Sequence, residues 1–404
     1  MTHLSKLSLR SFRGNQAALS PVSAALSGGL TALAVAIAAH QNQFEQVAAY
    51  TAGMSAAAIA AVLVSGGSTL SYVSGDDLLR ASVRRMRHAF TAPSLLLISV
   101  AACLIYSRAA DLPWIAVLLG GLTVCLNNLA ELPSADMQRG ERIILMTVSL
   151  TIARLVAIIA LVVGQGYPVA MTLSTALSLV FLSWLGRHAR TQRVTHEGLG
   201  QSLMRAYNFR LLALSLVSVA ILRVPFIVAP LVAPTVAQAG AFTVLLSAQQ
   251  SLLTFVTSGL YTIMAIRSKG RSDLQVADRM SRLERSHVIG ALLLSLGLVA
   301  ATPVVTRVFN VESLPGASLW WIVIVLAIAP TVANRAAQYR FLSSLRESAA
   351  VLILAVILVA EAIFVGVSLL LGGLLPLACS VLLSESVGYL WSLRERTTRR
   401  EVSA

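Results

Sequence analysis

Four charged residues interrupt stretches of the chain that are otherwise almost wholly apolar. They are Arg154, Arg223, Glu361 and Glu385. A charge near the middle of a membrane helix costs at least about 2.5 to 3.5 kcal/mol, so such side chains are expected to face the protein interior. Arginines there are suited to an anionic ligand, whereas paired carboxyl groups are suited to holding a coupling proton. Internal pairing as a purely structural contact is the alternative for both pairs.

Polar or small residues recur in three other apolar stretches at a spacing of three or four, which places them on one helix face. These polar stripes are Gln16, Ser20, Ser23, Ser27 and Thr31; Gly120, Thr123, Asn127 and Glu131; and Ser247, Gln250, Thr254, Thr257, Ser258 and Tyr261. Small and hydroxyl residues also serve close helix packing, which remains the alternative. Amides are costlier to bury and favour a water-lined cavity. The candidate binding residues are Arg154, Arg223, Asn127, Gln249, Gln250 and Tyr261.

The elements that must position these residues are membrane-spanning helices. Of the 404 residues, 57% are apolar and only 12% are charged, against about 25% charged in soluble domains. Crossing the hydrocarbon core takes about 20 helical residues, and each helix satisfies its own backbone hydrogen bonds. We therefore predict an all-α polytopic membrane protein of about twelve spans. They lie near residues 18–39, 46–71, 91–106, 112–132, 143–163, 169–185, 211–231, 238–266, 288–305, 317–332, 351–371 and 374–393.

The basic residues alternate from one connection to the next. Of the 31 Lys and Arg residues, only Arg108 and Arg307 fall on one side of the predicted spans, Arg154 and Arg223 lie within spans, and the rest fall on the other side. Basic loops stay in the cytoplasm, so both termini are predicted to be cytoplasmic in the plasma (inner) membrane. The net charge of +14 thus reflects topology and contact with the lipid bilayer, and no nucleic-acid partner is expected.

Two stretches of the chain resemble each other. Residues 46–67 align without gaps on residues 238–259, with Tyr50 matching Phe242, and a basic connection follows each. The repeat predicts two six-helix lobes related by a pseudo-two-fold axis, residues 1–200 and residues 201–404. This plan is typical of alternating-access transporters, which hold their substrate near the midplane between the lobes.

Residues suited to catalysis or to metals are sparse. Cys103, Cys125 and Cys379 fall in three different predicted spans, and no histidine lies in the middle of a span. The two lysines, Lys6 and Lys269, belong to no phosphate-binding loop. We therefore expect no catalytic residue, no metal site, no cofactor and no enzyme activity.

Four short motifs carry a family resemblance. They are the openings Gln46 to Tyr50 and Gln238 to Phe242, the connection Gln138 to Arg142, and the element Val308 to Asn310, with Asn310 replacing a glycine. With these motifs the chain resembles polysaccharide-type flippases of the multidrug, oligosaccharidyl-lipid and polysaccharide (MOP) exporter superfamily. The resemblance implies movement of a lipid-linked oligosaccharide from the inner to the outer leaflet. Its pyrophosphate would need cations, for which Arg154 and Arg223 are the candidates, and polysaccharide polymerases or glycosyltransferases are the implied partners.

Other branches and other classes fit less well. The drug-exporting branch usually carries an acidic residue in its first helix, and residues 18–39 contain none. The peptidoglycan-precursor branch usually has fourteen spans. A major-facilitator exporter is the nearest rival, because residues 75–85 faintly resemble its loop motif but lack the internal glycine. A membrane polymerase or acyltransferase would bring a long outer loop or an intramembrane histidine, and a non-transporting scaffold would not need buried charges.

Overall fold

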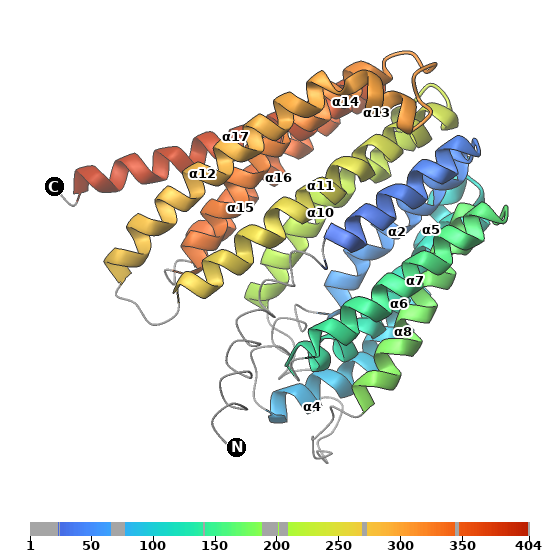
Figure 1. Cartoon of the computed structure of the whole chain (residues 1–404), viewed down its shortest axis with the longest axis horizontal. Coiled ribbons are helices and arrows are strands. Elements are labelled where there is room, and N and C mark those ends of the chain that lie inside the picture. The colour runs from blue at the N-terminus through green and yellow to red at the C-terminus, as the bar shows by residue number, and fades with distance from the viewer. Residues whose placement is uncertain are drawn as a thin grey trace, which may run out of the picture.

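The computed structural model describes residues 23, 25–65, 77–139, 142–187, 201, 209–268, 273–343 and 347–402. In this part of the chain, ten helices are long and apolar enough to cross a membrane. An eleventh candidate is a pair of helices bent by 71°, and a shorter apolar helix covers Ala25–His40. Figure 1 shows the arrangement of these helices. The prediction of an all-helical polytopic membrane protein is confirmed.

The helices follow the predicted spans in order. In the first half of the chain they are the helix Ala25–His40, α2 (Phe44–Ser65), α4 (Asp77–Met86), η1 (Arg87–Thr91), α5 (Ala92–Ala109), α6 (Trp114–Arg139), α7 (Ile143–Val162) and α8 (Tyr167–Arg187). In the second half they are α10 (Phe209–Val232), α11 (Val236–Ser268), α12 (Asp273–Ala300), α13 (Thr302–Val308), α14 (Ala317–Leu326), α15 (Ile328–Ser343), α16 (Glu347–Leu371) and α17 (Leu374–Val402). Residues 18–22, 24 and 66–71, which belong to the first two predicted spans, lie outside the described ranges.

The helices form two groups. In the first, α6 packs against α2, α5 and α8; in the second, α16 packs against α17, and α15 packs against both of these and α12. Helix α2 joins the groups through its contacts with α10 and α11. The predicted lobe boundary at residue 200 adjoins residues 188–200 and 202–208, which lie outside the described ranges, so it stays a prediction.

One end of the molecule, here called the short-turn end, holds the connections 41–43, 110–113, 163–166, 233–235 and 372–373. Figure 1 shows the two groups converging there and diverging toward the opposite, basic end, where α4 and the end of α17 lie. At the short-turn end, a Cβ atom on Gly240 would lie 2.1 Å from the carbonyl oxygen of Phe44. Only glycine therefore permits this contact between α11 and α2.

Two side chains add cross-group hydrogen bonds at the short-turn end. Asn310 adopts the left-handed conformation, with φ of 52°, and its Nδ2 donates to the Ala39 carbonyl at 3.2 Å. Asparagine tolerates this conformation better than most residues. The hydroxyl of Tyr106 in α5 donates to the carbonyl of Ile227 in α10. The two groups are therefore in close contact at this end.

Three predicted span boundaries were wrong where charged or amide residues lie inside helices. Residues 77–90 were expected to belong to a basic loop, but they form α4 and most of η1, and Arg87 is completely buried. The tenth span was predicted to end at residue 332, yet α15 continues to Ser343 with Asn334 buried. The fourth span continues to Arg139 rather than ending at residue 132. Charged and amide residues lower the hydropathy of a segment, so the predicted spans ended at them. Hydrogen bonds to partners inside the protein offset the free-energy cost of burying such residues.

Helix α10 contains two prolines, Pro225 and Pro230, within one continuous helix. A proline opens the helix locally and leaves nearby carbonyls available to other donors. Three residues before each proline, such a carbonyl does accept a side chain: Gln250 Nε2 donates to Leu222 at 2.9 Å, and Tyr106 donates to Ile227.

Candidate functional site

A central cavity of about 400 Å³ lies between the two groups of helices. It is lined by the helix Ala25–His40 together with α2, α6, α7, α8, α10 and α11. All three polar stripes meet at this cavity. The stripe residues in its lining are Ser27, Thr31, Thr123, Asn127, Ser247, Gln250 and Thr254.

Two arginines line the central cavity from opposite groups. Arg154 comes from α7 and Arg223 from α10. No hydrogen bond or ion pair joins either guanidinium group to another residue in the described ranges, and no Asp or Glu belongs to the described lining. A guanidinium group placed in a partly desolvated cavity without a counter-ion favours an anion, above all one that accepts two hydrogen bonds at once.

Tyrosine and threonine side chains form one wall of the cavity. Tyr50 donates to the Thr123 hydroxyl at 2.9 Å, and Thr123 lies 3.1 Å from the hydroxyl of Thr172. The Tyr50 ring also packs edge-on against Tyr167, at a centroid distance of 5.4 Å. The wall thus ties α2, α6 and α8 together. Sequence reasoning did not identify Tyr167 or Thr172, because neither extends a polar stripe.

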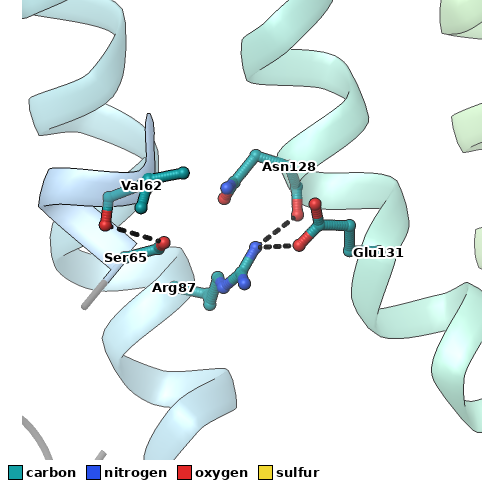
Figure 2. Close-up of polar contacts among 5 residues, drawn as sticks. All are labelled: Val62, Ser65, Arg87, Asn128 and Glu131. Carbon is teal, nitrogen blue, oxygen red and sulfur yellow. Dashed lines mark hydrogen bonds and ion pairs between the residues drawn. The ribbon is translucent and has the colours of Figure 1, made fainter. Parts of the chain in front are cut away.

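A second cavity of about 390 Å³, here called the antechamber, continues from the central cavity. The two share Met54, Asn127 and Arg223. The antechamber extends toward the basic end between α2, α6 and α10, and its polar lining includes Ser65, Asn128, Glu131 and Ser215. Figure 2 shows part of this wall, where Arg87 reaches from η1 toward Asn128 and Glu131.

An apolar groove of about 360 Å³ adjoins the central cavity on another side. The two share Gly28 and Ser251. Small residues of the helix Ala25–His40 face α11 here, while Phe309 and Trp321 complete the lining. Because the groove meets the central cavity, an apolar chain and a polar group of one molecule can occupy the two together.

Two of the six candidate binding residues, Gln249 and Tyr261, are not among the described residues that line these cavities. Gln249 is buried inside the protein, with 2% of its surface exposed, and belongs to none of the three linings. The side chain of Tyr261 lies outside the described part of the chain, although its backbone is in α11. The neighbouring Gln250 lines the central cavity and also contacts α10 through the carbonyl of Leu222.

Glu361 and Glu385 lie away from the described cavity linings, buried in α16 and α17. Asn334 Nδ2 of α15 donates to the Glu385 carboxylate at 2.6 Å and to its backbone carbonyl at 2.8 Å. Glu361 lies close enough to Glu385 for the two carboxyl groups to interact electrostatically. Within the described ranges, Glu361 Oε2 has no hydrogen-bond partner. A role for this pair in coupling stays a prediction.

Comparisons with solved structures identify the fold. The lipid II flippase MurJ in its inward closed conformation matches with a TM-score of 0.60 at 11% identity, over 94% of this chain and 87% of that one. An inward-facing multidrug-resistance MATE transporter of the MOP superfamily also scores 0.60, at 13% identity over 96% of both chains. This chain has the fold of MOP-superfamily transporters. The prediction of two six-helix bundles is thereby confirmed.

A third structure of this fold is a mutant of the Vibrio cholerae MATE transporter VcmN. It matches with a TM-score of 0.51 at 14% identity, over 98% of this chain and 94% of that one. No protein-family model matches the sequence, and no curated protein is similar to it. At these identities the MOP likeness concerns the fold alone, so the argument about cargo has to come from the cavity.

Proposed function

We propose that this chain is a transporter that moves a lipid-linked oligosaccharide or polysaccharide precursor across the membrane by alternating access. One observation carries the proposal: the central cavity holds Arg154 and Arg223 without an acidic partner in the described lining. A pyrophosphate joining a lipid to a sugar offers several charged oxygens to two guanidinium groups. A cationic drug would instead meet two like charges there.

The adjoining groove supports a lipid-linked cargo over a soluble anion. Apart from Ser251, its lining is apolar or glycine. A hydrocarbon chain placed there leaves water while its pyrophosphate stays beside Arg154 and Arg223. MurJ, named as a lipid II flippase, has the same fold, which agrees with a lipid-linked cargo.

The charge pattern supplies a direction. If the basic end is cytoplasmic, the contacts at the short-turn end close the outer side, and the antechamber leads from the cavity toward the cytoplasm. This arrangement suits cargo loading from the inner leaflet of the plasma membrane and release to the outer one. The lipid-linked sugars would come from glycosyltransferases, and a polymerase would use them after transport.

Reconstitution into vesicles tests the proposal. A fluorescent short-chain prenyl pyrophosphate carrying a sugar should reach the opposite leaflet faster with the wild-type protein than in empty vesicles. Arg154→Ala and Arg223→Ala should each slow this movement about tenfold or more, whereas Arg307→Ala, an exposed residue at the short-turn end, should have no effect.

Three results would overturn the proposal. Unchanged lipid movement in both cavity variants would remove the arginines from the site. Export of cationic dyes without lipid movement would identify a small-molecule exporter instead, and growth of sugar chains by the purified protein alone would identify a polymerase.

A further inference from the structure

The antechamber combines a fixed carboxylate with a buried amide oxygen. Both belong to α6, at Glu131 and Asn128, and both line the space between α6, α2 and α10. We infer that the antechamber binds sugar hydroxyl groups of the cargo, with Glu131 and Asn128 as hydrogen-bond acceptors. This inference rests on the proposed function, because it assigns a place to the uncharged part of the same cargo.

Arg87 holds Glu131 in position. Its Nη1 donates to Glu131 Oε2 at 2.8 Å and to the Asn128 carbonyl at 3.0 Å (Figure 2). The Arg87 side chain is completely buried, while 44% of the Glu131 side chain is exposed. A carboxylate offers about four acceptor positions, and the exposed part of Glu131 lines the antechamber, where hydroxyl donors of a ligand can reach it.

Asn128 supplies the second acceptor. Its Oδ1 atom is buried and has no hydrogen-bond partner among the residues that the structure describes, although buried amide oxygens are normally satisfied. In Figure 2 its side chain points from α6 toward the helix that carries Val62 and Ser65. The backbone carbonyl of Asn128 already accepts from Arg87, so the side chain does not serve that contact. A hydroxyl donor in the antechamber would satisfy this oxygen.

The backbone of this region is unusual. Arg87 begins η1, a π-helical segment of five residues between α4 and α5. Such segments are rare and frequent at functional sites. The π-helical turn lies where the Arg87 side chain leaves its helix to reach Glu131.

The charges orient the cargo along the cavities. A pyrophosphate next to Glu131 would be repelled, whereas Arg154 and Arg223 attract it to the central cavity. Sugar hydroxyl groups donate hydrogen bonds without carrying charge, and therefore suit acceptors such as Glu131 and Asn128. Arg223 lines both spaces and marks the boundary between them. The antechamber would therefore receive the sugar, and the apolar groove the lipid chain.

A nearby ion pair, Arg84 with Asp136, serves as a structural comparison for the Arg87–Glu131 pair. Arg84 of α4 pairs with Asp136 of α6 at 2.7 Å, and only 8% of the Asp136 side chain is exposed. Asp136 does not line the antechamber. The two pairs join the same two regions of the chain, so Asp136→Asn is a matched control for Glu131→Gln.

The experiment measures binding to the full-length protein in detergent. The probes are farnesyl pyrophosphate and three glycosylated forms, in which glucose, galactose or N-acetylglucosamine is attached to the terminal phosphate. At least one glycosylated probe should bind the wild type about tenfold more tightly than farnesyl pyrophosphate, the gain expected from one or two satisfied acceptors. Asn128→Ala and Glu131→Gln should remove most of this gain and leave farnesyl pyrophosphate affinity unchanged. Asp136→Asn should preserve the gain.

The outcomes separate this inference from the proposed function. If farnesyl pyrophosphate binds but no sugar raises its affinity, the sugar subsite is wrong and the cationic site stands. Equal losses for all probes in Asn128→Ala would also overturn the inference, because they would indicate a general structural effect. If no probe binds the wild type, the proposed function itself fails. Asn128→Ala leaves the ion pair of Arg87 intact, so it remains informative even if Glu131→Gln does not fold.

Discussion

Charged side chains have different surroundings at the central cavity and at the interface between α15, α16 and α17. At the cavity, Arg154 and Arg223 lie across an open space without partners in the described part of the chain. At the C-terminal interface, Glu385 accepts two hydrogen bonds from Asn334, and Glu361 is buried with 1% of its surface exposed. Both pairs look alike in the sequence, as single charges within apolar spans.

The difference separates charges available to a ligand from charges used by the protein. An unpaired guanidinium group beside a cavity can be neutralised by an arriving anion. A carboxylate already bound by an amide inside the protein is costly to disturb, because the lost hydrogen bond is not replaced by water. We therefore expect substitutions in the two regions to affect different measurements.

The largest expected effect comes from removing both cavity charges. The double variant Arg154→Ala/Arg223→Ala should bind farnesyl pyrophosphate at least about 100-fold more weakly, since a hydrogen bond to a charged group contributes about 1.5 to 3 kcal/mol. Its thermal unfolding midpoint in detergent should not fall, because neither arginine has a hydrogen-bond or ion-pair partner to lose in the described part of the chain. Thermophoresis and a melting curve on the same samples check this. Lower stability with normal binding would mean that the two arginines stabilise the fold and do not bind the ligand.

Asn334→Ala should show the opposite pattern. It removes the donor to Glu385 and should lower the free energy of unfolding by about 2 kcal/mol. Affinity for farnesyl pyrophosphate should stay at the wild-type value, because Asn334 lies in none of the described cavity linings. Chemical denaturation followed by tryptophan fluorescence measures the change. An affinity loss comparable to that of the arginine variants would mean that the interface and the cavity are coupled.

Asn127→Ala is the matched substitution at the cavity. Asn127 is exposed where the central cavity and the antechamber meet. Its loss should weaken binding of a glycosylated farnesyl pyrophosphate by about five- to tenfold and leave unfolding unchanged. The same two assays apply. If the variant proves less stable and binds normally, Asn127 serves helix packing rather than the cargo.

The smallest effect on binding is expected for Glu361→Gln. Glutamine has nearly the same shape and cannot release a proton, so affinity should change by less than about twofold while any dependence of transport on a proton gradient disappears. Lipid movement in vesicles with and without an imposed gradient tests this. Unaltered gradient dependence in both Glu361→Gln and Glu385→Gln would exclude the pair from coupling.

Periodicity and composition indicated several residues that line the central cavity. Four of the six candidate binding residues, Arg154, Arg223, Asn127 and Gln250, line one cavity. Polar residues on one face of a membrane helix have to avoid lipid, which brings such faces together at one cavity. Their role in binding stays a prediction. Gln249 follows the same logic, but one residue along a helix rotates the side chain by about 100°, and it packs into the interior.

Other features depended on partners that are remote in the sequence. Arg87 was expected in a cytoplasmic loop, because a charge next to an apolar run normally marks its end. Glu131 and the Asn128 carbonyl, about forty residues away, allow it to be buried instead. Asn334 is likewise buried in α15 because its partner, Glu385, lies in another helix, α17.

The order of the helices, their approximate limits and the faces that carry polar groups were determined by the sequence itself. Hydrocarbon imposes a local requirement on every segment that crosses it: about 20 apolar residues and a fully bonded backbone. Only the tertiary structure decided which buried charges are paired and which face a cavity. Pairing depends on atoms brought within about 3 Å by the packing of separate helices, and no property of a single segment encodes that distance.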